Sequence, residues 1–366
     1  MKYLTILLTV CFVLCACTKD TETAETSNTS ISDVDEYLTE EQYNETLYRY
    51  SCMLDEKIYF VRYQSSELLV YDPVKNEVTN VCTGIGCDHT GICDYANSFF
   101  TYSLCSDGEY LYFVSNVING NNISIGIFAY DPVEKNCEKI LENRYVNGDV
   151  SMVFDIEEAM LYYLDPQGNE SISQGYSLFS FDTNDKKSVL LRDELSTDVC
   201  FSVNDNDYVY SDLQMLYDSN GTRIDRGVYW MRWTGNDLYY LRSENNNSAS
   251  LVRRKGEEKS EVLISSVASD VILDAGTVTA LAGERGSYKL CYGDADAIET
   301  DVLSDTLDGA YISLINRVDG KLLLYVVPGE NSDMATGYYT ISASNPASQP
   351  LPVSLHLADI DPMAPQ

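Results

Sequence analysis

The stretch Asp107-Gly108-Glu109-Tyr110-Leu111-Tyr112-Phe113 decides the fold, because it is the clearest copy of a phrase that recurs along the chain. A turn-forming pair is followed by a run that usually ends in one or two Tyr. Asp and Gly tolerate the backbone of a tight turn, and aromatic residues favour strands. The phrase therefore predicts a turn that leads into a β-strand. Further copies lie at residues 55–60, 158–163, 206–210, 235–240, 274–279 and 319–325.

The spacing of these copies indicates a repeat architecture. One anchor residue in each copy gives steps of 53, 50, 47, 30, 40 and 45 residues, the anchors being Tyr59, Tyr112, Tyr162, Val209, Tyr239, Thr279 and Leu324. Most steps lie in or near the 40–50 residues of a propeller blade. The seven anchors predict an all-β fold, a β-propeller of seven blades. Because the 30-residue step is short for a full blade, six and eight blades remain alternatives.

A second phrase follows several anchors and completes the unit. It occurs at residues 69–73, 128–132, 178–182 and 288–292, and a polar turn and another apolar run come after it. Strand, turn, strand, turn, strand is a meander. One such sheet cannot bury both of its faces alone, whereas sheets stacked radially cover one another.

The N-terminus has the pattern of a targeting segment. Lys2 is followed by a largely apolar run, residues 4–15, that is too short to span a bilayer as a helix. Leu14-Cys15-Ala16-Cys17 resembles a bacterial lipobox. This resemblance implies a signal peptide over residues 1–16 and a diacylglycerol on the thiol of Cys17. The alternative is an ordinary secretory signal. We expect no other membrane-spanning segment, because no other stretch reaches 18 uninterrupted apolar residues.

Composition divides the rest of the chain. Residues 17–46 are rich in Thr, Ser, Glu and Asp and predict a flexible acidic tether after the lipidated Cys. We expect the propeller over residues 47–360 and a short tail over 361–366. The 366 residues carry 24 Lys and Arg against 57 Asp and Glu, a formal charge of −33. That charge argues against nucleic-acid binding, which needs clustered cations.

The strongest candidate for metal chemistry is the Gly-rich loop at residues 82–93. It holds Cys82, Cys87, His89 and Cys93, and three thiolates with one imidazole can complete a structural Zn²⁺ site. Disulfides compete with this interpretation, since an exported chain can be oxidised. Eight Cys remain after removal of the leader and lipidation of Cys17, and they allow 105 pairings. Cys52 and Cys105 each precede an anchor by seven residues, so we expect equivalent places in successive repeats.

The same loop carries a resemblance. Tyr-rich propeller lipoproteins of Gram-positive, clostridial-type bacteria have two Cys, a His two residues on, and another Cys before Ala. Here Cys82, Cys87, His89 and Cys93 are followed by Asp94-Tyr95-Ala96. The chain is similar to that group, whose repeats are compared with the β-propeller of low-density-lipoprotein-receptor-related proteins. The resemblance implies a fold and an extracytoplasmic location and supplies no activity. The complete Tyr-Trp-Thr-Asp repeat is absent.

Other chemical candidates are few. Trp230 and Arg232 share one face of a predicted strand, where they could contact a sugar or a peptide, although packing between sheets is the competing interpretation. Residues 351–357 alternate as a half-buried edge strand that could close the ring together with residues 47–50. This alternation places His356 on the polar face as a solvated side chain. The Asp-rich turn at residues 204–207 could bind Ca²⁺ weakly, with solvated turn chemistry as the alternative.

The sequence therefore predicts a propeller anchored to the outer face of the cell membrane and acting as a binding module. We expect no enzyme, because only two His are present and no phosphate loop, nucleophile elbow or His-Glu-x-x-His motif occurs. The expected ligand is a protein, a peptide or a glycan. Two alternatives remain: a carbohydrate-active enzyme with carboxylates in the central funnel, and a metal-dependent envelope sensor that uses the Cys/His loop.

Overall fold

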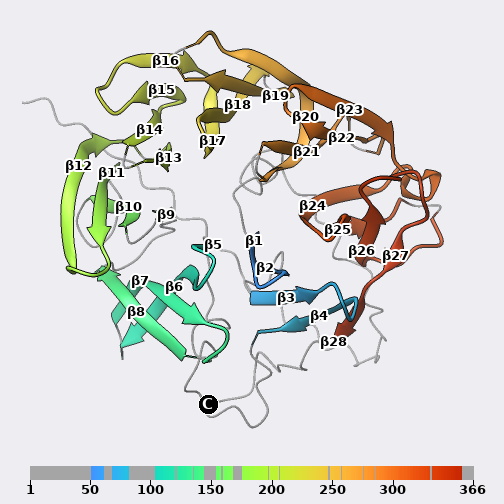
Figure 1. Cartoon of the computed structure of the whole chain (residues 1–366), viewed down its shortest axis with the longest axis horizontal. Coiled ribbons are helices and arrows are strands. Elements are labelled where there is room, and N and C mark those ends of the chain that lie inside the picture. The colour runs from blue at the N-terminus through green and yellow to red at the C-terminus, as the bar shows by residue number, and fades with distance from the viewer. Residues whose placement is uncertain are drawn as a thin grey trace, which may run out of the picture. The chain divides into compact units, whose positions relative to one another are not determined.

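Antiparallel sheets make up nearly all of the structure, which is a computed structural model (Figure 1). It describes residues 51–61, 68–81, 104–119, 122–134, 136–143, 154–157, 160–167, 175–196, 198–205, 207–245, 248–256, 258–274, 276–284, 286–329 and 332–356. All of them belong to the unit Asn44–Gln366. The predicted leader, lipidated Cys17 and tether lie outside the described residues.

The described strands form six sheets, numbered here along the chain. Sheet 1 contains β1 (Ser51–Leu54), β2 (Lys57–Val61), β3 (Leu68–Asp72), β4 (Glu77–Asn80) and β28 (Ser354–His356); sheet 2 contains β5 (Leu104–Ser106), β6 (Leu111–Asn119), β7 (Asn122–Asp131) and β8 (Asn136–Asn143). Sheet 3 contains β9 (Phe154–Glu157), β10 (Met160–Gln167), β11 (Gly175–Asp182) and β12 (Lys187–Leu195); sheet 4 contains β13 (Val199–Asn204), β14 (Asp207–Asp212), β15 (Met215–Asp218) and β16 (Arg223–Arg226).

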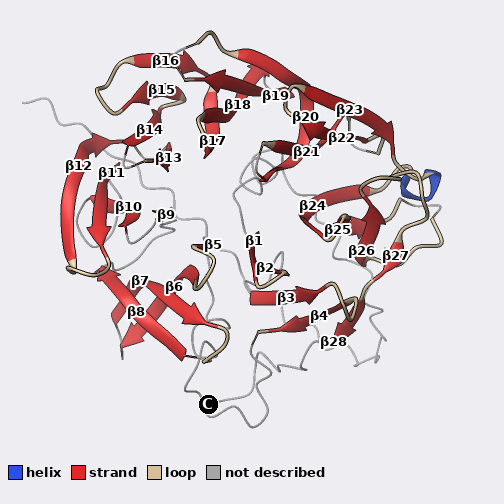
Figure 2. Cartoon of the chain, viewed as in Figure 1, coloured by secondary structure: helices blue, strands red, loops and turns tan. Residues whose placement is uncertain are grey.

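Sheet 5 has seven strands, β17 (Val228–Thr234), β18 (Asp237–Asn245), β19 (Ser248–Lys255), β20 (Glu261–Asp274), β21 (Thr277–Ala282), β22 (Lys289–Asp294) and β23 (Ala297–Val302). Sheet 6 contains β24 (Tyr311–Val318), β25 (Lys321–Val327), β26 (Gly337–Ser342) and β27 (Leu351–Pro352). The described helix is one 3-10 turn, Asp305–Leu307, between β23 and β24 (Figure 2).

The long strand β20 explains why sheet 5 is larger than the others. Its first part pairs with β19, from Glu261 opposite Arg253 onward. Its last part pairs with β21, and the register shifts between Val267 and Val271. The strand therefore ends one meander and begins the next, so sheet 5 consists of two four-stranded sets that share β20.

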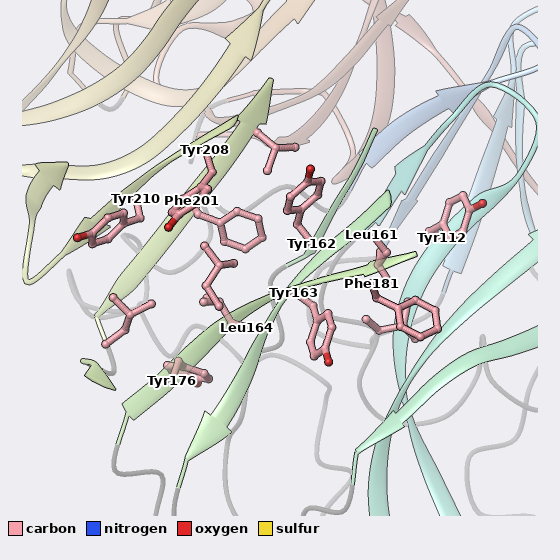
Figure 3. Packing of buried hydrophobic residues seen from close by; sticks show 14 of the residues in the cluster. Tyr112, Leu161, Tyr162, Tyr163, Leu164, Tyr176, Phe181, Phe201, Tyr208 and Tyr210 are labelled. Atoms are coloured by element: carbon pink, nitrogen blue, oxygen red, sulfur yellow. The ribbon is translucent and has the colours of Figure 1, made fainter. Parts of the chain in front are cut away.

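The clusters of buried residues join successive four-stranded sets, and one of them lies between the two sets of sheet 5. Tyr59 of sheet 1 packs with Phe113 of sheet 2, and further clusters join the later sheets in order. Figure 3 shows the cluster that extends from sheet 2 through sheets 3 and 4. The last cluster joins sheet 6 to sheet 1, with the Phe60 and Tyr338 rings 5.3 Å apart. The sheets thus succeed one another around a common centre (Figure 1). The prediction of an all-β propeller is confirmed at this level.

The strand register confirms that the seven anchors occupy equivalent positions in successive sets. All seven lie in the second strand of a four-stranded set, in β2, β6, β10, β14, β18, β21 and β25. The second phrase supplies third strands, β3, β7, β11 and β22. Cys52 lies opposite Tyr59 and Cys105 lies opposite Tyr112, so their equivalence in successive repeats is confirmed.

The 30-residue step between Val209 and Tyr239 reflects short connections. Sheet 4 has all four strands, but β15 and β16 have four residues each. Gly227 alone links β16 to β17, at φ 73°. A Cβ at this position would lie 3.0 Å from the carbonyl oxygen of Ser243, so a side chain would crowd the backbone. Sheet 4 is therefore a complete four-stranded meander, although its strands and connections are short.

The C-terminal segment closes the circuit differently from the prediction. Residues 351–356 break at Val353 into β27, which pairs with β26, and β28, which pairs in parallel with β4. The predicted partner, residues 47–50, lies outside the described residues. Pro352 does lie on an edge strand, as expected. The predicted continuous half-buried strand is wrong: Leu351 and Leu355 are 60% and 46% exposed, because the segment crosses from one sheet to the next.

Val353 holds this crossing in place. Its side chain is 7% exposed and belongs to the cluster that contains Tyr71 of sheet 1 and Tyr338 of sheet 6. Its N–H donates to the Tyr338 carbonyl at 3.0 Å. On the other side of the crossing, the Asn76 side-chain amide donates to the Pro352 carbonyl at 3.1 Å. The segment therefore fastens the last sheet to the first at their outer strands.

We predict that Val353→Ala lowers the free energy of unfolding by about 1–3 kcal/mol, because it removes buried methyl groups from the contact between sheets 6 and 1. Urea unfolding followed by Trp fluorescence measures the change. The matched control is Leu355→Ala, two residues along the same segment, which should change stability by less than about 0.5 kcal/mol. Equal effects of the two substitutions would show that the crossing does not fasten the sheets.

Candidate interaction face

The turns that join the first and second strands of the sets carry exposed acids. Six of these turns belong wholly or partly to the described residues, and each has at least one carboxylate in it or directly beside it. We call these side chains the acidic rim: Asp55, Glu56, Asp107, Glu109, Asp205, Asp237, Asp274 and Asp319. All are exposed except Asp237, which is half-buried. The cations nearest to these turns in sequence are Lys57 and Lys321, both partly buried.

These turns lie at one end of their sheets. In a four-stranded meander, the first and third turns fall at the same end. Contacts between neighbouring sets agree with this rule: Asp237 of a first turn and Asp296 of a third turn both pair with Arg253. Lys186, in the third turn of sheet 3, lies 4.0 Å from Glu138, which follows the third turn of sheet 2. The rim and the third turns therefore share a face.

Asp side chains fix the backbone of these turns. One oxygen of Asp107 accepts the N–H groups of Glu109 and Tyr110, at 2.9 and 2.8 Å. The other accepts the Tyr112 hydroxyl at 2.9 Å. Burial raises the pKa of Tyr112, and this hydrogen bond raises it further. The anchor Tyr thus stays a neutral donor that holds the turn against the core.

The third turns repeat the arrangement. The Oδ1 atoms of Asp72, Asp131 and Asp182 each accept two backbone N–H groups, from the second and third residues that follow. For Asp182 these bonds lower the pKa of the carboxyl group. Three copies of the second phrase carry Asp at or next to their last residue for this reason, because its carboxylate caps the turn into the fourth strand.

A buried cation joins two sets at this face. Arg253 of β19 is 3% exposed and donates to Glu261 and Asp296, with Asp237 3.8 Å from its guanidinium. Lys255 also donates to Asp296, at 2.9 Å. Lys255 and then Arg253 lower the pKa of Asp296. The carboxylates of Asp237, Glu261 and Asp296 are thus paired within the fold, whereas most side chains of the acidic rim are exposed to solvent.

The predicted lipidation and metal-binding residues lie outside the described residues; they are Cys17, Cys82, Cys87, His89 and Cys93. Lipidation and the choice between zinc and disulfide therefore stay predictions. Within the described part of the chain, no three His, Cys, Asp or Glu side chains are grouped as metal ligands. In the same part, no helix has the length and hydropathy of a membrane span.

Trp230 and Arg232 occupy different surroundings. Trp230 is 4% exposed and packs with Tyr239 and Leu273 across the two sets of sheet 5, which favours the packing interpretation of this residue. Arg232 is exposed on β17, the first strand of its set. Its positive charge acts to lower the pKa of the Cys52 thiol in β1, the first strand of sheet 1. Burial of this thiol has the larger and opposite effect, so the pKa is raised to about 12. Ligand binding by Arg232 stays a prediction.

The structure also describes His356 and part of the Asp-rich turn at residues 204–207. His356 is solvent-exposed, 3.8 Å from a carboxylate oxygen of Glu77, as expected for a polar face. Asp205 is exposed, and Asp207 accepts the N–H of Tyr208 with its own side chain. Asp205 and Asp207 thus have the features of solvated turn residues.

Comparison with known proteins supports the fold. No protein-family model and no curated protein matches the sequence. The chain is similar to the β-propeller domain of the Trilobed protease from Pyrococcus furiosus, a propeller of open velcro topology, with a TM-score of 0.50 and 13% identity over 80% of this chain and 93% of that one. An acylaminoacyl peptidase from Pyrococcus horikoshii also has a TM-score of 0.50, with 12% identity over 70% of this chain.

A further acylaminoacyl peptidase, solved with a chloromethyl ketone, has a TM-score of 0.50 and 10% identity over 81% of this chain. The chain spans 45% and 52% of the lengths of the two acylaminoacyl peptidases. At such identities the likeness shows the fold alone: the chain is a β-propeller. Peptidase activity is a property of those proteins.

The sequence did not predict the acidic rim, because within any single copy of the phrase these Asp and Glu residues indicate only a turn. The available signal was the recurrence of a carboxylate a few residues before each anchor, as in Asp55, Asp107 and Asp319. Only the circular arrangement gathers these turns on one face, so their shared charge follows from the fold.

We predict that Asp296→Asn makes stability less dependent on pH in acid. The pKa of Asp296 is lowered in the folded state, so its charge stabilises the fold above the unfolded-state pKa of about 4. This contribution is lost as the pH falls through the folded-state pKa. The variant should therefore be less stable than Asp308→Asn near pH 6, and the difference should disappear towards pH 2.

Urea unfolding of both variants at several pH values measures this difference. Asp308 is exposed, and Asp308→Asn makes the same change in net charge. A constant gap between the two variants from pH 6 to pH 2 would contradict the assigned role of the ion pairs at Asp296.

Proposed function

We propose that this chain is a lipid-anchored, extracytoplasmic interaction module that binds a cationic protein or peptide partner at the acidic rim. The rim is the observation that carries the proposal. Carboxylates recur in or directly beside all six described first turns, and one face gathers them. Such a face attracts a cationic partner and speeds its encounter, and complementary charge selects against acidic competitors.

The proposal includes a propeller of seven blades. Sheets 1, 2, 3, 4 and 6 each supply one four-stranded set, and sheet 5 supplies two that share β20. The seven anchors, each in a second strand, support the same number. Seven first turns then surround the centre, and the turn at residues 158–159, which is not among the described residues, also begins with an acid, Glu158.

Attachment to the membrane completes the proposal. The lipobox ending at Cys17 supports a diacylglycerol anchor, and residues 18–46 support a flexible tether between this anchor and the propeller. A tether of this length has a mean reach of about 30 Å. The acidic body would be held off an anionic membrane surface, with its rim available to partners. These features, with the loop at residues 82–93, support membership of the Tyr-rich propeller lipoprotein group.

The rim can be tested with a defined polycation. We predict that Glu56→Lys/Glu109→Lys/Asp274→Lys weakens binding of a fluorescent oligolysine peptide at least about tenfold at low salt, since three charges of the rim are inverted. Fluorescence anisotropy measures the affinity. Raising the salt to about 0.5 M should remove most of the difference, because the Debye length falls well below 10 Å.

The matched control is Asp198→Lys/Asp305→Lys/Asp308→Lys, which makes the same change in net charge. These three residues are exposed in connections that lead from one set to the next, at the end of the sheets opposite the rim. The control should change the affinity by less than about threefold. Equal losses in both variants would show that total charge alone attracts the peptide and would refute the rim as a binding face.

The anchor has its own test. We predict that Cys17→Ala releases the protein from the membrane fraction, because two buried acyl chains supply the attachment and neither can be added without the thiol. Metabolic labelling with a fatty acid and the mass of the mature N-terminus measure the modification. A labelled, membrane-bound Cys17→Ala protein would contradict the lipobox, and Cys15→Ala serves as the matched control.

A further inference from the structure

The outer strand of a propeller sheet is an edge that can pair with another chain, and most such edges here are blunted. The β8, β12 and β16 ladders each contain a register shift. The outer edge of sheet 1 is β28, of three residues, and that of sheet 6 is β27, of two residues, one of them Pro352. Bulges, short strands and Pro are the usual protections against added strands.

The edge formed by β23 has no bulge or Pro, and its remaining protection is the charge of Glu299 and Asp301. Its six residues pair with β22 without a register shift, from Ala297 opposite Asp294 to Val302 opposite Lys289. It contains neither Pro nor Lys. No other strand among the described residues pairs with its outer side. Since antiparallel ladders bond alternate residues, about half of the β23 backbone groups face outward.

The two faces of β23 differ in chemistry. Glu299 and Asp301 are exposed on one face, and the Tyr292 hydroxyl lies between them, 3.1 and 2.9 Å from their oxygens. Ile298 is on the other face, partly buried against the core, and Val302 is 63% exposed on the same side. The edge thus alternates acidic and apolar positions.

We propose that β23 binds an extended peptide segment that adds a strand to sheet 5 and carries Lys or Arg at alternate positions. Main-chain hydrogen bonds to an exposed edge supply affinity in this mode, and alternate side chains supply specificity. Cations on the incoming strand lie beside Glu299 and Asp301, and apolar residues between them lie beside Ile298 and Val302. Opposite charges and apolar pairs stabilise neighbouring strands in this way.

This site is separate from the acidic rim. Glu299 and Asp301 belong to an outer strand, whereas the rim is formed by turns that follow first strands. The inference therefore goes beyond the proposed function and stands if the rim fails its test. Both the rim and β23 attract cations. Binding at β23 also requires that the partner be extended and have free backbone N–H groups, whereas binding at the rim requires charge alone.

The test uses an acetylated and amidated Lys-Val-Lys-Val-Lys-Val peptide with the full chain. Binding is measured by isothermal titration, and protection of the amides of residues 297–302 is measured by hydrogen exchange. We expect Glu299→Lys/Asp301→Lys to weaken binding at least about tenfold. The matched control, Glu134→Lys/Asp185→Lys, inverts two exposed carboxylates in the third turns of sheets 2 and 3, away from β23, and should change the affinity by less than about threefold.

A second arm alters only the peptide, so it does not depend on the folding of a variant. N-methylation of alternate residues removes the N–H groups while keeping the charge, and it should abolish the amide protection of residues 297–302, whereas binding that needs charge alone would remain. Equal protection of residues 297–302 by the methylated and unmethylated peptides would overturn the added strand. Equal losses in the β23 variant and its control, or protection outside residues 297–302 alone, would also overturn the assignment to β23.

Discussion

The structure depends on one constraint: a four-stranded sheet with two apolar faces can bury them only against neighbouring sheets. Tyr59, Tyr112 and Tyr239 are almost fully buried, yet each lies near the turn of its hairpin, where a single sheet would leave it exposed. Stacking the sets around a centre covers both faces of every set. The same constraint makes the contact between sheets 6 and 1 obligatory, and Val353, Phe60 and Tyr338 meet there.

The burial of a Tyr ring also explains one acid of the rim. Tyr112 keeps its hydroxyl bonded to Asp107 while its ring enters the core. At Asp107, therefore, one carboxylate satisfies both the turn backbone and the aromatic hydroxyl. Tyr240 donates at 2.6 Å to a different kind of carboxylate, Asp225 in the outer strand β16 of the neighbouring set. A partner that binds the rim would thus use, at Asp107, a charge that the fold already requires.

Much of the fold could be predicted from the sequence, and little of the candidate sites. The anchors lie in second strands because apolar and turn residues recur locally, and local patterns are visible in one dimension. The path of the C-terminal segment was wrong because its strict alternation suited one half-buried strand, whereas Val353 is shared between two sheets. The burial of Trp230 depended on what the neighbouring set contributes, namely Leu273, which is 43 residues away.

By itself, the sequence determined the hairpin rhythm, the turn chemistry of Asp72 and Asp107, and the equivalence of Cys52 and Cys105, because these depend on residues close together in the chain. Only the tertiary structure decided that carboxylates of successive turns share a face, that β20 belongs to two sets, and that β23 ends as an edge without a bulge or Pro. Those features are relations between sheets, and they arise where distant segments meet to bury the surfaces that each leaves exposed alone.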